Sequence, residues 1–596
     1  MRLHATENWA VSLILAAMVL IPLAESLLRP ALGIGIPGSA TIVQHLTLLV
    51  GMVGGAIAAR ENRLLSLSTA ATFLKGRWRT GANVYAYSFS AAISLLLAAA
   101  GVQYVASERE AARILVYGIP VWVVQAALPA GFLIVALRLL WHAAATFRAR
   151  LIAVALAASI LAISFWPPVA PAHLRAPALI LLLGATICGG PVFATLGGAA
   201  LILFWAQDQT IASLAVDHYR LVVNPSFPTI PLFTLAGYFL AEGGASKRLV
   251  RVFLALFGRF RGGPAIVTAL VCAFFTTFTG ASGVTILALG GLLMPILTAA
   301  RYPDRAALGL LTGAGSLGLL FPPCLPVILY AIIARINMEQ MFLGGILPGI
   351  LLVALTIWWG VRQNPKHTAG DQPFDLGEAK AALWDARWEL LFPVVALVSL
   401  FAGFATPVEA AALTALYAFV AEAFLHRAMT VRHAVRVMTE CGMLIGGVLL
   451  ILGVALGFVN FLVDAEIPSR GVEWVTASIQ SSLMFLLLLN VFLLAVGALM
   501  DIYSAIIIVV PLIVPLGAAY GIDPVHLGII FLANMELGYL TPPVGMNLFL
   551  ASYRLNKPMP EVYRAVVPML LVLLAGVLLI TYIPPMTTVL PRLLSR

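Results

Sequence analysis

Residues 318–323 read GLLFPP and residues 538–543 read GYLTPP, so the chain carries nearly the same proline-broken segment twice. In both copies an apolar run follows the prolines, and another proline stands at the same distance upstream: Pro295 in one copy and Pro515 in the other. Proline lacks the N–H of a helical hydrogen bond, and its ring clashes with the carbonyl four residues earlier. A repeated break of this kind in apolar sequence predicts a transporter whose binding site lies near the middle of the membrane.

The composition indicates a membrane protein. Charged residues make up 10% of the 596 residues, hydrophobic residues make up 62%, and the mean hydropathy is +1.02, whereas a soluble domain has about 25% charged residues. We therefore predict an all-α polytopic membrane protein with about 15–17 transmembrane segments, two of them re-entrant helical hairpins. The net charge of +10 is attributed to membrane topology, so no nucleic-acid partner is expected.

The chain divides into unequal parts. Residues 1–150 form a four-helix, scaffold-like domain, residues 151–176 form a connecting helix and tether, and residues 177–596 form a transport domain with two repeats. The apolar segments of the first part lie near residues 9–28, 41–59, 84–105 and 114–141. Basic residues in the second loop and after the fourth segment place both ends of this domain in the cytoplasm.

Two long apolar windows, residues 264–300 and 482–520, are each interrupted midway by small or polar residues. Each window is compatible with two full spans or with a re-entrant hairpin, because irregular backbone at membrane depth is tolerated where it is buried in protein. Basic residues flank the first window on both sides, whereas the second has no such excess. Opposite flanking charges predict an inverted repeat.

The proline breaks predict a cation site. Prolines 322 and 323 deprive the carbonyls of Gly318 and Leu319 of their helical partner, and the second pair does the same to Gly538 and Tyr539. Carbonyl oxygens can replace the hydration shell of Na⁺. A hairpin tip opposite each break would complete each site, and the free N–H groups that begin its second helix would suit an anion.

Several ionisable residues in apolar runs have alternative interpretations. Asp501 and Glu536 are predicted to be functional, because such groups are rare in membrane segments. Asp501 has a second interpretation as the N-cap of a hairpin helix. Glu409, in a TPVE sequence, is equally compatible with a structural role. Arg60 and Arg63 are interpreted as topological charges.

No cofactor is expected. The four cysteines lie in apolar stretches without a CxxC pair, and the nine histidines form no matched pair that would hold a haem.

Several motifs resemble one family. Residues 177–590 resemble the large membrane subunit of tripartite ATP-independent periplasmic (TRAP) transporters, and residues 1–150 are similar, on weaker motifs, to its small four-helix subunit. The motifs of the large-subunit part are PLFTLAG (231–237), GASGVT (280–285), GGILPG (344–349), TPVEAA (406–411) and TPPVGMNL (541–548). Those of the small-subunit part are the stretch from Gly55 to Arg63, PVW (120–122) and LPAGF (128–132).

The resemblance implies a fused permease of the bacterial inner membrane and no enzyme activity. It implies elevator-type, Na⁺-coupled import of a small organic anion, usually a carboxylate such as a dicarboxylate, delivered by a periplasmic substrate-binding protein. Besides that protein, membrane lipid is an expected partner. One departure is that residues 280–286 read GASGVTI, without the aspartate that many family members carry after the first hairpin tip.

Site residues follow from the breaks and the resemblance together. The predicted sodium ligands are Ser282, Gly283, Gly318, Phe321, Pro323, Gly497, Gly538, Thr541 and Pro543. The predicted substrate contacts are Gly280, Ser282, Thr285, Asp501 and Asn547.

Three other functions remain open at this point. A carboxylate or oxyanion permease that works without a binding protein would share the architecture. A membrane subunit of a respiratory complex would need cofactor ligands or proton-relay chains. A passive channel would not accumulate its solute in response to a sodium gradient.

Overall fold

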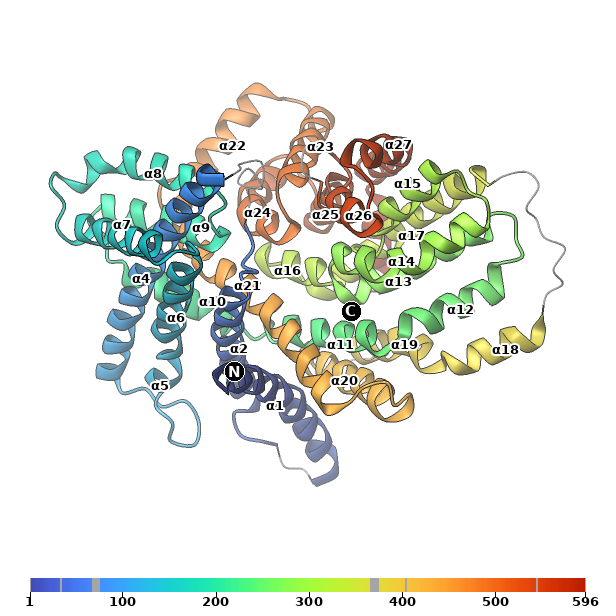
Figure 1. Cartoon of the computed structure of the whole chain (residues 1–596), viewed down its shortest axis with the longest axis horizontal. Coiled ribbons are helices and arrows are strands. Elements are labelled where there is room, and N and C mark those ends of the chain that lie inside the picture. The colour runs from blue at the N-terminus through green and yellow to red at the C-terminus, as the bar shows by residue number, and fades with distance from the viewer. Residues whose placement is uncertain are drawn as a thin grey trace. The chain divides into compact units, whose positions relative to one another are not determined.

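The computed structural model describes residues 2–32, 35–66, 76–364, 375–401, 405–542 and 545–594. The described chain is almost entirely helical, with two isolated β-bridges (Figure 1). Within it, 12 helices are long and apolar enough to cross a membrane, and four shorter apolar helices accompany them. The predicted all-α polytopic class is confirmed.

Backbone contacts divide the chain into two compact units. The first unit comprises Met1–Pro231 and Val435–Arg470, and the second comprises Leu232–Ala434 and Gly471–Arg596. Both predicted hairpins and both proline breaks belong to the second unit.

The first unit begins with the four predicted spans. They are α1 (Arg2–Leu32), α2 (Ser39–Arg60), α4 (Gly76–Ala111) and the pair α5 (Val121–Gln125) and α6 (Ala127–His142). The fourth span starts later than predicted, because residues before Pro120 form a turn closed by a 2.8 Å hydrogen bond from the Leu115 N–H to the Ile119 carbonyl. The unit continues with α7 (Phe147–Phe165), α8 (Pro171–Ile187), α9 (Val192–Ala206), α10 (Ala212–Val222) and most of α21 (Val431–Asp464).

Glycines bring α2 and α21 together inside the first unit. A Cβ at Gly54 would overlap the Gly442 carbonyl, and one at Gly446 would overlap the backbone of Gly54 and Gly55. Small residues allow such close backbone approach between membrane helices.

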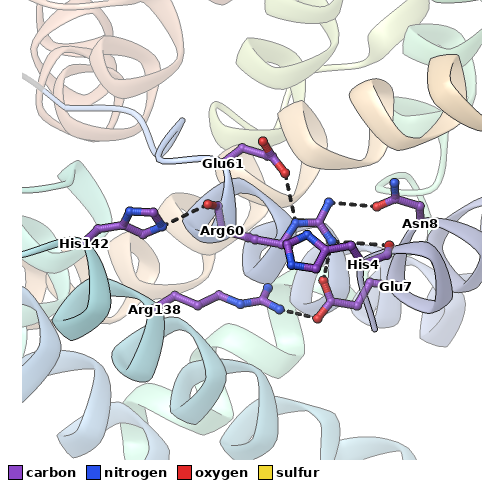
Figure 2. Close-up of polar contacts among 7 residues, drawn as sticks. All are labelled: His4, Glu7, Asn8, Arg60, Glu61, Arg138 and His142. Atoms are coloured by element: carbon purple, nitrogen blue, oxygen red, sulfur yellow. Dashed lines mark hydrogen bonds and ion pairs between the residues drawn. The ribbon is translucent and has the colours of Figure 1, made fainter. Parts of the chain in front are cut away.

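Arg60, at the end of α2, is the centre of a polar network in the first unit (Figure 2). Its guanidinium donates to Glu7 at 2.6 Å and to Asn8 at 2.8 Å, both on α1, and Arg138 of α6 also pairs with Glu7. The His142 ring contacts the Arg60 carbonyl at 2.9 Å. Arg60 therefore joins three helices, a role that the topological interpretation does not include.

The second unit contains the remaining helices. These are α11 (Thr229–Gly243), α12 (Ala245–Phe257), α13 (Gly263–Thr279), α14 (Ser282–Ala299), α15 (Asp304–Ala314), α16 (Leu325–Ile333), α17 (Met338–Arg362), α18 (Leu376–Asp385), α19 (Arg387–Phe401), α20 (Pro407–Val420), the π-helical turn η1 (Ala421–Leu425), α22 (Ile467–Ser478), α23 (Ser482–Leu499), α24 (Ile502–Ala519), α25 (Pro524–Gly538), α26 (Met546–Leu555), α27 (Met559–Tyr582) and α28 (Pro585–Leu594). Two of these helices, α11 and α22, begin a few residues before the unit boundary.

A buried ion cluster ties α12 to α19 and η1. The Arg248 guanidinium pairs with Glu389 and, at 2.5 Å, with Glu422, and neither glutamate side chain is exposed to solvent. The three residues are far apart in the sequence, and no local pattern pointed to them. Removing one member of a buried pair leaves an uncompensated charge, so the cluster fixes these elements together.

Candidate functional site

The first hairpin turns at a glycine. Helix α13 ends at Thr279, and Gly280 has a left-handed φ of +66°. A Cβ on Gly280 would lie 2.8 Å from the Leu325 Cβ, so a larger residue does not fit. Helix α14 begins at Ser282, which is buried. Residues 276–285 are called the first tip.

The first break is longer than the proline pair alone predicts. Helix α15 ends at Ala314 and α16 begins at Leu325, so residues 315–324 are non-helical. Gly318 lies directly against the first tip, because its Cβ would overlap the Ala273 carbonyl and the Thr277 N–H nitrogen of α13. Residues 315–324 are called the first break.

Threonine hydroxyls connect the first tip to the first break. Thr276 Oγ1 donates to the Gly315 carbonyl at 2.7 Å and also contacts Thr285 Oγ1 at 2.8 Å. Thr277 Oγ1 lies 3.3 Å from the Gly318 carbonyl, which also accepts from the Phe321 N–H at 3.2 Å. Pro322 cannot supply the helical N–H to the Gly318 carbonyl, yet these two donors leave that carbonyl satisfied.

The second hairpin turns at an extended residue rather than a left-handed one. Helix α23 ends at Leu499, Met500 has φ −137° and ψ 164°, and α24 begins at Ile502. Asp501 is the N-cap of α24: its carboxylate accepts from the Ser504 N–H at 3.0 Å and from the Ser504 hydroxyl at 2.6 Å. Residues 497–504 are called the second tip.

The described residues between the end of α25 at Gly538 and the start of α26 at Met546, called the second break, lie against the second tip. A Cβ on Gly538, which precedes the break, would lie 2.5 Å from the Gly497 Cα. The Ile502 N–H donates to the Tyr539 hydroxyl at 2.8 Å, and the Gly545 N–H lies 3.3 Å from the Ala498 carbonyl.

The carbonyls at the second break are also partnered. The Gly538 carbonyl accepts from the Thr541 N–H at 2.9 Å, and the Tyr539 carbonyl accepts from the Asn547 N–H at 3.2 Å. Pro542 cannot supply the helical N–H to the Gly538 carbonyl, yet both carbonyls are satisfied by these other donors. Pro543, a predicted sodium ligand, lies outside the described residues.

The two tips meet. Tyr503 of the second tip donates its hydroxyl to the Gly280 carbonyl of the first tip at 2.7 Å. Helix α26, which follows the second break, lies along α14, since a Cβ on Gly283 would lie 2.5 Å from Leu550 Cδ1 and one on Gly290 would lie 3.2 Å from Arg554 Cγ. The structure thus gathers both tips and both breaks in one unit.

Two buried polar groups in these elements have no partner within the described chain. Asn547, near the start of α26, is fully buried, and both atoms of its amide lack a hydrogen bond. The Ser316 hydroxyl, in the first break, is also buried without a partner. Unpaired buried polar atoms are costly, so they mark places where a ligand can bind.

The three acids of the apolar runs differ in their bonding. Asp501 caps α24, as its second interpretation held. Glu409 forms a capping box with Thr406 at the start of α20, which supports its structural interpretation. Glu536, near the end of α25, is buried, and neither of its carboxyl oxygens has a hydrogen-bond partner among the described residues.

Sequence reasoning missed the residues that connect the elements. Thr276, Thr277 and Tyr503 were not among the predicted site residues, because hydroxyls in apolar runs are common and only their tertiary partners distinguish them. Across the described residues, no group of three or more His, Cys, Asp or Glu side chains could hold a metal ion. The four cysteines are free thiols.

The repeated broken helices and the many apolar spans define a multi-pass transport protein. The model of the TRAP transporter DctM component matches residues 179–586, and that of the DctQ component matches residues 18–149. The chain therefore belongs to the tripartite ATP-independent periplasmic transporter family, with both membrane components fused in one permease. It is a protein of the inner membrane and not an enzyme.

Named relatives cover a range of organic acids. The chain is 35% identical over 402 residues to the C4-dicarboxylate TRAP transporter large permease protein DctM of Pseudomonas aeruginosa, covering 67% of this chain and 94% of that protein. It is 32% identical to the isethionate TRAP transporter permease protein DctMQ of Oleidesulfovibrio alaskensis, covering 67% and 63%. It is 28% identical to the 2,3-diketo-L-gulonate TRAP transporter large permease protein YiaN of Escherichia coli, covering 68% and 95%.

Proposed function

We propose that this permease imports a small organic anion together with Na⁺, by an elevator movement of the domain that carries the tips and breaks. A periplasmic substrate-binding protein delivers the anion. The observation that carries the proposal is the hydrogen bond from Tyr503 to Gly280, because it joins the two tips beside two non-helical breaks. The names of the relatives support an organic acid as the substrate.

The substrate would lie between the tips, near Gly280, Ser282, Thr285, Asp501 and Asn547. Helices α14 and α24 both begin at the tips, and their positive dipole ends favour an anion. The unpaired Asn547 amide supplies both a donor and an acceptor.

Sodium would bind where tip and break face each other. The first site would use Ser282, Gly283, Gly318, Phe321 and Pro323. The second would use Gly497, Gly538, Thr541 and Pro543. The Gly538 carbonyl accepts one hydrogen bond, so its second lone pair is offered to the ion. At Gly318, whose carbonyl accepts from the Phe321 N–H and from Thr277 Oγ1, the ion would replace the 3.3 Å contact from Thr277.

The coupling is favourable on energetic grounds. Each net positive charge that moves inward gains about 2.3 kcal/mol per 100 mV of membrane potential. Two sodium ions with a monoanion would move one net positive charge and so respond to the potential.

The test is uptake of labelled organic acids into proteoliposomes, with the cognate binding protein added and with Na⁺ and membrane potential varied separately. We expect accumulation that requires an inward Na⁺ gradient and the binding protein together. Uptake that only equilibrates the substrate would indicate a channel. Accumulation without the binding protein would indicate a carboxylate or oxyanion permease that works without one.

A further inference from the structure

Glu536 is an acidic side chain that the fold does not neutralise. It lies on α25 and is only 1% exposed. Both carboxyl oxygens lack a hydrogen-bond partner within the described chain. A buried carboxylate without a partner is strongly unfavourable, so it requires a compensating cation or a proton.

The other buried acid of the hairpin region does not share this property. Asp501 accepts two hydrogen bonds from Ser504, and these stabilise its charge locally. No comparable hydrogen bonds reach the Glu536 carboxyl from the described residues, although Glu536 lies only two residues before Gly538 on α25. The difference makes Glu536 the group whose charge still needs a partner.

The direction of Glu536 follows from its helix. Gly538 and Asn534 face α23, since Gly538 touches Gly497 and Asn534 donates to Asn490 at 2.6 Å. Two residues turn a helix by about 200°, so Glu536 lies on the opposite side of α25, away from the second tip.

That opposite side faces the first break. A Cβ on Gly345 would lie 3.6 Å from Ile529 Cδ1, two turns before Glu536 on the same side of α25, and would overlap the Leu320 carbonyl of the first break. Helix α16, which begins directly after that break, also packs against α25, because the rings of Tyr330 and Phe531 lie 5.4 Å apart.

The first sodium site proposed above contains no charged ligand. Its residues, Ser282, Gly283, Gly318, Phe321 and Pro323, offer only hydroxyl and backbone oxygens, and residues 280–286 contain no acid. A cation in an apolar environment binds more tightly when an anion lies near it.

Resting on the proposed function, we propose that Glu536 supplies the negative charge that holds Na⁺ at the first break. The carboxylate reaches this break from α25, in the opposite repeat. One sodium site is thereby built from both halves of the transport domain.

The experiment measures Na⁺ binding without transport. Purified protein in detergent is titrated with NaCl at constant ionic strength, with KCl as the replacement salt, and its thermal unfolding temperature is recorded. The neutral, isosteric variant Glu536→Gln is expected to need at least about tenfold more Na⁺ than the wild type to reach half of the wild-type stabilisation. A tenfold loss of Na⁺ affinity corresponds to about 1.4 kcal/mol. Glu536→Asp, which keeps the charge, is expected to lie between the two.

Asp523→Asn is the matched control. Asp523 is the N-cap of the same helix, and asparagine retains the cap while removing the same charge about 20 Å away. Its Na⁺ response should equal that of the wild type. In KCl, Glu536→Gln should unfold at the same temperature as the wild type or higher, because an uncompensated buried charge has been removed.

The outcomes separate the two proposals. Wild-type protein that shows neither Na⁺-dependent stabilisation nor Na⁺-driven uptake would refute the proposed coupling. A wild type that responds to Na⁺, together with a Glu536→Gln variant that responds identically, would refute only the role of Glu536. If Glu536→Gln does not fold, a Glu536→Asp variant whose Na⁺ response equals that of Glu536→Ala would also refute it.

Discussion

The two tip-and-break pairs share a sequence pattern but are built differently. The first pair turns at a left-handed glycine and is joined by threonine hydroxyls, and its break spans residues 315–324. The second pair turns at the extended residue Met500, Asp501 caps the helix that follows, the Tyr539 hydroxyl joins tip and break, and the break lies between Gly538 and Met546. An internal repeat thus preserves where the helices break, whereas each copy closes its own break with different side chains.

The difference also concerns charge. The second tip contains an acid that is satisfied within its own hairpin, whereas the first tip contains none. Glu536 comes to the first break from the other repeat, so the two pairs depend on each other. The variants below test that dependence and the closures specific to each pair.

The largest effect is expected from removing the first proline pair. Alanine at both Pro322 and Pro323 restores backbone N–H groups and allows a continuous helix, so Na⁺-driven uptake into proteoliposomes should be abolished. Pro542→Ala leaves one proline of the second pair in place and should lower uptake less. Wild-type sodium dependence in the double variant would contradict the role of the first break.

Glycine packing is the next most sensitive feature. Gly318→Ala and Gly538→Ala each push a methyl group into neighbouring backbone, and each should destabilise the protein by about 1–3 kcal/mol. We expect the larger loss at Gly318, which lies against a helix interior rather than against another glycine. The unfolding temperature in detergent measures the effect.

Gly471→Ala is the control for the Gly318→Ala and Gly538→Ala variants, because a Cβ on Gly471 would meet nothing within 4 Å. Its unfolding temperature should not fall. Equal, small shifts in all three variants would mean that the tips and breaks are not packed as described.

Asp501 can be tested for its two roles separately. Asp501→Ala removes the cap and should cost about 1 kcal/mol of stability, whereas Asp501→Asn keeps a capping oxygen and should unfold like the wild type. Because the carboxylate lies at the proposed binding site, Asp501→Asn should still reduce uptake. Normal uptake by that variant would leave capping as the whole role of Asp501.

The smallest effect is expected at the contact between the tips. Tyr503→Phe removes the hydroxyl that donates to the Gly280 carbonyl and should cost about 1 kcal/mol while slowing uptake. Tyr417→Phe removes a similar bond, to the Trp388 carbonyl at 2.8 Å, and neither of these two residues belongs to a tip. It should lower stability by a similar amount without changing uptake, and an equal loss of uptake in both variants would argue against a special role for Tyr503.

Much of the architecture could be read from local sequence. Long apolar runs predicted the membrane helices, because a helix in lipid must satisfy its backbone internally and present apolar side chains. The residues around Gly280, Asp501 and the two proline pairs marked where helices end, since glycine, capping residues and proline act on the backbone nearby.

The partners of those residues could not be read in the same way. The prolines were predicted to deprive the Gly318 and Gly538 carbonyls of their helical partner, yet each carbonyl accepts a hydrogen bond from the N–H three residues later. The Arg248 cluster joins residues up to 174 positions apart, and no local rule selects such partners.

The sequence by itself determined the class of the protein, the places where its helices break and the family to which it belongs, because apolar length and proline chemistry are local properties. Only the tertiary structure decided that the Tyr503 hydroxyl donates to the Gly280 carbonyl. It also decided that Asp501 is hydrogen-bonded within its own helix, whereas the Glu536 carboxyl has no hydrogen-bond partner among the described residues. Those facts depend on which side chains a folded chain brings within hydrogen-bonding distance, and helix packing sets that distance.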